Sequence, residues 1–223
     1  MEVKRGLLLT AGNQKLSASI YHWSLPPIRA CPGRSAECTS RCYGLKGRFH
    51  YPQVRERLEW CFEMSKRRDW VRLMVDEIYR KGILVCRFHV VGDLYSPGYA
   101  EKVKAVVEQS PHCTFFLYTR SYAVPTILPV IREMGKLDNL TVWLSADRSM
   151  GYPSEVPEGC KVAWMMVDED ETVPEGVDLL FRDYPLRKKP LALPLLPVIC
   201  PTETVEGKNA GVTCATCTRC WRE

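Results

Sequence analysis

The sequence predicts an α/β protein built on a parallel sheet, with a partial (β/α)6 barrel as the expected arrangement. Short β-branched and aromatic runs recur along the chain, helical segments separate several of them, and Gly and Pro mark the junctions. Such alternation is typical of parallel sheets with right-handed crossovers. Six strand–crossover units can curl into an incomplete barrel.

The first half of the chain predicts two strands around a helical region. Residues 17–26 alternate weakly and predict an opening strand. Residues 51–82 have a helical composition, and we expect two helices that end at Gly82. The apolar run 82–93 follows that glycine and predicts the second strand.

The middle of the chain repeats the pattern. Residues 96–110 predict a helix with Ser96 as N-cap and Pro97 at its first position. Its apolar face would consist of Tyr99, Val103, Val106 and Val107. A second helix is expected over 124–136, and the further strands are expected within 113–121, 139–149, 159–170 and 176–185.

The last forty residues have a different composition. Five prolines break every candidate helix or central strand there, namely Pro185, Pro190, Pro194, Pro197 and Pro201. We therefore divide the chain into a barrel unit, 1–183, and a Cys-rich, Pro-rich extension, 184–223, which we expect to be an extended strap.

The 11 cysteines indicate metal binding rather than disulfides. The chain has 223 residues, 46% of them apolar, and can bury a core without cross-links. Its start is too short in apolar residues for a signal peptide, and no run could span a bilayer. We expect a cytoplasmic protein without a membrane partner, where clustered thiols more often hold metal.

The C-terminal thiols suggest an iron–sulfur cluster. Cys214, Cys217 and Cys220 form a C-x2-C-x2-C loop, and Cys200 precedes it. Such a loop wraps one side of a 4Fe–4S cubane while a fourth thiolate arrives from elsewhere. Four thiolates also suit zinc, although zinc sites usually show two separated C-x2-C pairs. Unligated thiols are the third interpretation.

The N-terminal thiols are only three. Cys31, Cys38 and Cys42 are spaced C-x6-C-x3-C in a polar loop, so a cluster there would keep one iron open for a ligand. Alternatively, Cys200 completes one structural cluster that joins the two ends of the chain. The single cysteines are expected to be core residues, namely Cys61, Cys86, Cys113 and Cys160.

Polar residues at predicted strand ends form the candidate site. By alternation, Arg87, His89 and Asp93 would share one face of the second strand. A water-lined cavity would explain them, and so would a buried ion pair with an aspartate such as Asp147 or Asp183. The remaining candidates at strand ends are Tyr118, Arg120, Ser145 and Asp147.

A basic run, 65–73, and a net charge of +5 permit nucleic-acid binding, although such a run is more often a solvated helix face. The sequence contains no Walker loop, G-x-G-x-x-G, H-E-x-x-H or serine-hydrolase elbow. These absences argue against the corresponding nucleotide-binding, zinc-protease and hydrolase classes.

Eight stretches resemble the gene product 88 family of phages and plasmids, from Gly12 to Trp221. They are GNQKL, WSLPP, CPG, CYG, RFHVVGD, FFLYTRS, VWLSADR and CATCTRCW. The resemblance implies iron–sulfur binding, in the cytoplasm of a bacterial host if the chain is phage-encoded.

The layout also resembles radical S-adenosylmethionine (SAM) enzymes, partial barrels with a three-cysteine loop after the first strand. That resemblance implies SAM as a cofactor, although those enzymes space their cysteines C-x3-C-x2-C. It assigns catalytic roles to Arg87, His89 and Arg120. It assigns cofactor contacts to Gly92, Asp93, Tyr118, Ser145 and Asp147.

We therefore favour a radical-SAM-like enzyme with one or two 4Fe–4S clusters, whose substrate the sequence does not identify. The second interpretation is a non-catalytic iron–sulfur module that binds nucleic acid or a phage or host protein. The third is a zinc-bound structural protein.

Overall fold

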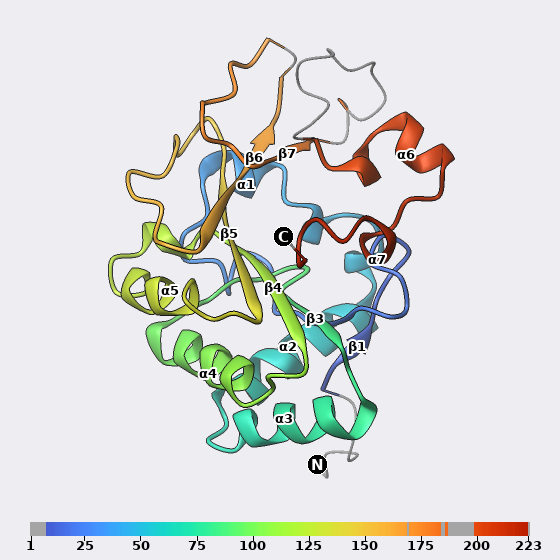
Figure 1. Cartoon of the computed structure of the whole chain (residues 1–223), viewed down its shortest axis with the longest axis vertical. Helices are drawn as coiled ribbons and strands as arrows, with labels where there is room; N and C mark the ends of the chain where they lie inside the picture. The colour runs from blue at the N-terminus through green and yellow to red at the C-terminus, as the bar shows by residue number, and fades with distance from the viewer. Residues whose placement is uncertain (1–7, 169, 184–185, 187–198, 223) are drawn as a thin grey trace.

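The computed structural model describes residues 8–168, 170–183, 186 and 199–222. Seven strands form one sheet whose order follows the chain, β1 to β7 (Figure 1). The strands are β1 (Thr10–Ala11), β2 (Tyr21–Trp23), β3 (Val85–Phe88), β4 (Thr114–Thr119), β5 (Leu140–Ala146), β6 (Cys160–Met166) and β7 (Leu179–Arg182). Strand β1 is antiparallel to β2, and every other neighbouring pair is parallel. The α/β class is confirmed, while closure into a partial barrel stays a prediction.

The long helices lie where the sequence predicts them. They are α2 (Pro52–Lys66), α3 (Trp70–Lys81), α4 (Pro97–Glu108) and α5 (Leu128–Met134). Helix α3 ends at Gly82, which has a left-handed conformation with φ 59° that suits glycine. Helix α4 begins after Ser96, whose hydroxyl accepts a hydrogen bond from the N–H of Tyr99 at 3.2 Å.

Shorter helical turns lie in the loops and the tail. They are α1 (Ala36–Ser40), α6 (Val205–Asn209), α7 (Cys214–Cys217), and the 3₁₀ turns η1 (Tyr43–Leu45), η2 (Gly47–His50), η3 (Ser121–Ala123) and η6 (Pro201–Glu203). Helices α6 and α7 correct the prediction that the whole tail is extended. The four prolines between 185 and 197 lie outside the described residues.

Two further expectations were wrong. Strand β1 was not predicted, because two residues are too few to show alternation. The described residues between β5 and β6, and between β6 and β7, contain no helix. Prolines and glycines punctuate the first of these connections, at Gly151, Pro153, Pro157 and Gly159. The alternation of strand with helix therefore stops at β5.

The sheet is covered on both faces. In Figure 1, helices α3, α4 and α5 lie on one side of the central strands, and the red tail lies on the other. On the helix side, Phe115 and Leu117 of β4 belong to the main core. On the tail side, Phe116 packs with Cys214, and Trp143 with Cys200. The boundary between units at 183 and 184 stays a prediction.

No helix among the described residues combines the length and apolar character that crossing a membrane requires.

Candidate functional site

The thiol loop, residues 25–45, crosses the C-terminal ends of the strands. The N–H of Leu25 donates to the carbonyl of Val91 at 2.9 Å, just after β3. A Cβ atom added at Gly33 would lie 2.0 Å from the carbonyl oxygen of Arg120, so the loop backbone rests directly on the residue after β4. In parallel α/β sheets, ligands bind at this edge.

The three loop thiols are neighbours. Cys31, Cys38 and Cys42 are half-buried. Burial, the negative charge of Asp93 and the neighbouring Cys38 and Cys42 together raise the pKa of Cys31 to about 12, although a backbone hydrogen bond from Ile28 opposes them. Burial also raises the pKa of Cys38, with Cys42 adding to the effect and Arg120 opposing it. The raised pKa values favour the protonated forms of Cys31 and Cys38, and a metal must displace those protons to bind these thiols.

A buried ion pair anchors the loop. The guanidinium of Arg120 lies 2.6 Å from the carboxylate of Asp147, which is fully buried after β5. The hydroxyl of Ser35 donates to the same carboxylate oxygen at 2.5 Å and accepts from the N–H of Cys38 at 2.9 Å. Burial alone would raise the pKa of Asp147, but Arg120 and the Ser35 hydroxyl lower it below the usual aspartate value. The turn that carries Cys38 is thus tied to β4 and β5.

A second buried carboxylate lies beneath the thiols. Asp93 accepts hydrogen bonds from the hydroxyl of Thr119 at 2.6 Å and from the N–H of Arg120 at 2.8 Å. Burial raises its pKa, and these hydrogen bonds only partly offset that effect. The preceding Gly92 has φ 83°, and a Cβ there would lie 2.5 Å from that of Leu25. Asp93 therefore bridges the ends of β3 and β4.

Partly buried ion pairs connect α1 to the strand ends further along the sheet. Glu37 accepts hydrogen bonds from Arg41 at 2.9 Å and from Arg148 at 2.8 Å, and these lower its pKa. Arg41 also lies 2.6 Å from Asp183, the residue after β7. The loop is thus connected to the ends of β5 and β7 as well.

Arg87 and His89 do not share a face, so that prediction was wrong. The guanidinium of Arg87 lies over the rings of Phe116 and Tyr118, on the tail side of the sheet. His89 has φ 60°, which ends the alternation, and its Nε2 hydrogen-bonds with the hydroxyl of Tyr99 of α4 at 2.8 Å. The aspartates that we considered as partners of Arg87 pair with other arginines.

The tail thiols lie on the face of the sheet that is opposite to helices α3, α4 and α5. The hydroxyl of Tyr118 donates to Sγ of Cys220 at 2.9 Å. Burial, with a smaller effect from the neighbouring Cys200 and Cys214, raises the pKa of Cys220 to about 11, although the hydrogen bond from Tyr118 opposes the shift. Burial also raises the pKa of Cys214, and the neighbouring Cys200 and Cys217 add to that shift. The four thiols that the sequence groups are therefore electrostatic neighbours.

A lysine from the other end of the chain lies beside these thiols. Lys15 forms a 3.1 Å ion pair with the buried Glu203, and its carbonyl accepts from the N–H of Cys214 at 2.8 Å. Burial opposes its charge, but Glu203, Cys200 and Cys214 raise its pKa overall. Residues before β2 thus form part of the tail site.

One protein-family match covers nearly the whole chain, including both groups of thiols. The sequence model described as gene product 88 matches residues 4–223. The chain belongs to the gene product 88 family. No curated protein and no solved structure matches it.

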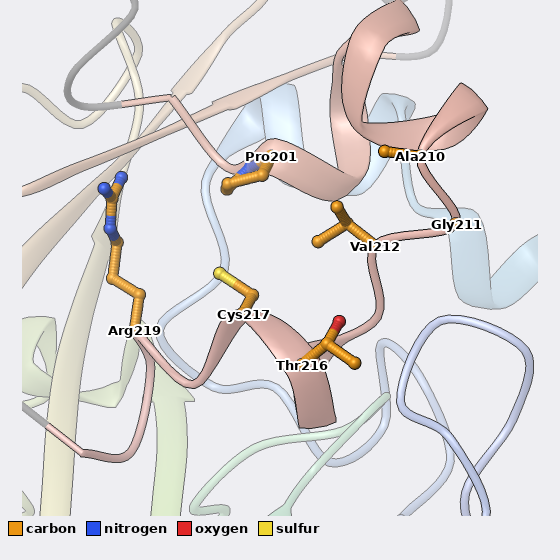
Figure 2. Close-up of a pocket in the computed structure, with 7 residues that line it drawn as sticks. All are labelled: Pro201, Ala210, Gly211, Val212, Thr216, Cys217 and Arg219. Atoms are coloured by element: carbon orange, nitrogen blue, oxygen red, sulfur yellow. The ribbon is translucent and has the colours of Figure 1, made fainter.

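In this gene product 88 protein, a pocket of about 470 Å³ opens beside the tail thiols. Figure 2 shows the sulfur of Cys217 pointing into it, across from Pro201, with Arg219 at one side. Figure 2 also places Val212 and Thr216 on the wall opposite to Arg219. Cys217 therefore faces open space, in contrast to the buried Cys200 and Cys214.

The thiols of this gene product 88 protein are neighbours rather than a closed ligand set. Among the residues that the structure describes, no three His, Cys, Asp or Glu side chains lie close enough to hold a metal ion. The chemistry of the donors nevertheless fits a cluster, since thiolates are the ligands that iron–sulfur centres use.

The structure brings Gly92, Asp93, Arg120 and Asp147 together at the thiol loop and leaves Arg87, His89, Tyr118 and Ser145 elsewhere. Tyr118 lies with the tail thiols, and the carbonyl of Ser145 accepts from the hydroxyl of Tyr122 at 3.3 Å. Sequence reasoning missed Ser35, Arg41 and Lys15. Only Ser35 carried a local signal, because a serine three residues before Cys38 suits a helix N-cap.

Proposed function

We propose that this protein is an iron–sulfur protein with a radical-SAM-like arrangement. Cys31, Cys38 and Cys42 hold a 4Fe–4S cluster at the C-terminal edge of the sheet. The observation that carries the proposal is the thiol loop itself, which presents three neighbouring thiols over the strand ends and is anchored by Arg120 and Asp147.

Three thiols leave one position of a cubane for a ligand other than cysteine. When bound by Cys31, Cys38 and Cys42, a reduced cluster would supply one-electron chemistry to SAM. Arg120 donates to Asp147 and Ser35 through Nη1, and no described residue accepts a hydrogen bond from its Nη2. That nitrogen can bind the carboxylate of the cofactor, and Asp147 keeps the guanidinium in place.

The tail thiols, Cys200, Cys214, Cys217 and Cys220, hold a second cluster with a structural role. Four thiolates place a large negative charge on a buried site, and the positive charge of Lys15 next to Cys200 and Cys214 offsets part of it. The tail packs on Phe116 and Trp143, so metal binding there stabilises the cover of one sheet face.

The test is anaerobic purification with iron and acid-labile sulfide counted per chain. Two 4Fe–4S clusters predict about eight irons and eight sulfides. Cys38→Ala is expected to remove about half of the iron, while Cys160→Ala, a half-buried thiol outside both groups, retains all of it. Adding SAM to the reduced wild-type protein is expected to change the electron paramagnetic resonance spectrum.

Each alternative predicts a different result. A colourless, zinc-loaded protein would establish the zinc-bound structural interpretation. One cluster lost in both Cys38→Ala and Cys200→Ala would indicate that the two ends share a single structural cluster. A full complement of iron with a spectrum that SAM leaves unchanged would favour the non-catalytic module.

A further inference from the structure

A basic and aromatic segment begins in the last three residues of the thiol loop and continues into α2. No acidic residue occurs between Cys38 and Arg55, although the segment contains four Arg or Lys residues. We define the aromatic rim as residues 43–55, which comprise η1, η2 and the first turn of α2. The 3₁₀ turns are compact, since the rings of Tyr43 and Phe49 meet edge to face at 6.0 Å.

The cations of the aromatic rim have no acidic partner. Lys46, Arg48 and Arg55 are exposed, and no described carboxylate forms an ion pair with any of them. The guanidinium of Arg55 instead lies 2.7 Å from Nδ1 of His50. The rim therefore presents uncompensated positive charge, which attracts polyanions.

Other basic parts of the surface differ in this respect. In the run 65–73, Lys66 pairs with Glu63, Arg67 with Asp69, and Arg72 with Asp76. That run is thus largely a compensated helix face. The contrast identifies the aromatic rim as the better candidate for binding a polyanion.

The rim also exposes large apolar side chains. Tyr43 is 55% exposed, Tyr51 54% and Leu45 42%, which are high values for such residues. The side chain of Tyr51 contacts no other ring and forms no hydrogen bond within the described residues. Its ring is therefore available to stack on a planar group.

We propose that the aromatic rim binds a single-stranded polynucleotide. Positive charge tracks a phosphate backbone, and exposed rings stack on unpaired bases, whereas a duplex keeps its base faces covered. The hydroxyl of Tyr43 donates to the carbonyl of Val90 at the end of β3, so the rim adjoins the edge that carries the thiol loop. If the proposed function holds, the rim would bring a nucleic-acid substrate to that edge.

The test measures fluorescence anisotropy of the full chain with labelled oligo(dT), oligo(U) and a duplex of about 12 nucleotides each. Tyr51→Ala is expected to weaken single-strand binding about 5- to 150-fold, and Tyr51→Phe to preserve it. The matched control is Tyr79→Ala, because Tyr79 is also 54% exposed but lies on α3. Tighter binding of oligo(U) would identify RNA, and tighter binding of oligo(dT) would identify DNA.

The cations are tested by salt dependence. Arg48→Gln is expected to reduce the slope of log K against log salt by about 0.7 for a single strand. Arg68→Gln changes an exposed cation in the turn between α2 and α3 and should leave the slope unchanged. Equal binding of duplex and single strand, no binding at all, or an equal loss in Tyr51→Ala and Tyr79→Ala would overturn the proposal.

Metal content separates this inference from the proposed function. Iron and sulfide are expected to be unchanged in Tyr51→Ala and Arg48→Gln, because neither residue is a thiol ligand and both side chains are exposed. Loss of binding with full iron supports the rim, whereas a wild-type protein without iron that still binds oligonucleotides would overturn only the proposed function.

Discussion

His89 is a histidine that the fold keeps uncharged. It is buried, its backbone is in the left-handed region, and its Nδ1 has no hydrogen-bond partner among the described residues. Burial, followed by the positive charge of Arg87, lowers its pKa to about 3. The neutral imidazole hydrogen-bonds with Tyr99 and belongs to the packing between β3 and α4. We expect His89 to act on stability rather than on a bound ligand.

His89 is expected to make the protein less stable in acid. The unfolded chain protonates this histidine below its ordinary pKa of 6.5, whereas the folded protein does so only near 3. The unfolded state therefore binds more protons in this window. As the pH is lowered, the free energy of unfolding decreases by up to about 1.4 kcal/mol per pH unit. Asparagine tolerates a left-handed backbone. In His89→Asn, the urea concentration at the unfolding midpoint should therefore depend less on pH between about pH 6.5 and 4.

A matched substitution provides the control for this effect. His112 is exposed, so His112→Asn should retain the pH dependence of the wild-type protein. The pKa of His22 is also lowered by burial, to about 4, and His22 accounts for the acid sensitivity that remains in His89→Asn. An unchanged pH profile in His89→Asn would contradict the assignment.

The element that holds the candidate site is the thiol loop, and it depends on its contacts rather than on its own secondary structure. Helix α1 has only five residues and buries none of them. An isolated helix of this length is not stable, because nucleation is costly. Ser35, Arg41 and the close approach of Gly33 to Arg120 hold the loop in place. Its geometry therefore follows that of the strand ends.

Gly33→Ala is expected to displace the loop. The new Cβ would meet the backbone of Arg120 at 2.0 Å, and backbone cannot move aside as a flexible side chain can. Overpacking of this kind costs about 1–3 kcal/mol of stability. Chemical denaturation measures that loss, and hydrogen exchange should quicken for residues 31–42.

Gly98→Ala is the control for the added methyl group. Gly98 lies in α4 with nothing within 4 Å of the added Cβ, so alanine should stabilise the protein by about 0.5–1 kcal/mol. Exchange in the thiol loop should not change. Equal effects of the two substitutions would show that the approach at Gly33 does not position the loop.

At the scale of the whole molecule, the tail completes the burial of the sheet. Phe116, Tyr118 and Trp143 point away from the helices, and residues around Cys200, Cys214 and Cys220 cover them. The indole N–H of Trp143 donates to the carbonyl of Cys220 at 3.1 Å. Without this cover, a large apolar surface would face water.

Loss of a tail ligand is therefore expected to uncover the sheet. If Cys217 is a ligand, Cys217→Ala should remove about half of the iron and make residues 199–222 sensitive to limited proteolysis, because metal binding contributes to local folding. Cys160→Ala should remain resistant. A Cys217→Ala protein that keeps all its metal and resists protease would show that Cys217, which faces the pocket, is not a ligand.

Local patterns were sufficient for most elements of the fold. Apolar β-branched runs predicted β3 to β7 within longer ranges, and Ser96 with Pro97 correctly marked the start of α4. Gly82 correctly marked the end of α3. These signals act over a few residues, since capping, turns and alternation depend on neighbours in the chain. The same local signals identified both groups of cysteines.

The partners within the site were decided by the tertiary structure alone. Ser35 meets Asp147 across 112 positions of sequence, and Lys15 meets Glu203 across 188. The left-handed backbone of His89, which removes its side chain from the face of Arg87, follows from packing against Tyr99 rather than from any residue pattern. The sequence by itself determined the parallel α/β architecture and the thiol groups, because both are written in local spacing. Only the folded chain decided which charges meet over the strand ends, because burial pairs residues that are distant in sequence.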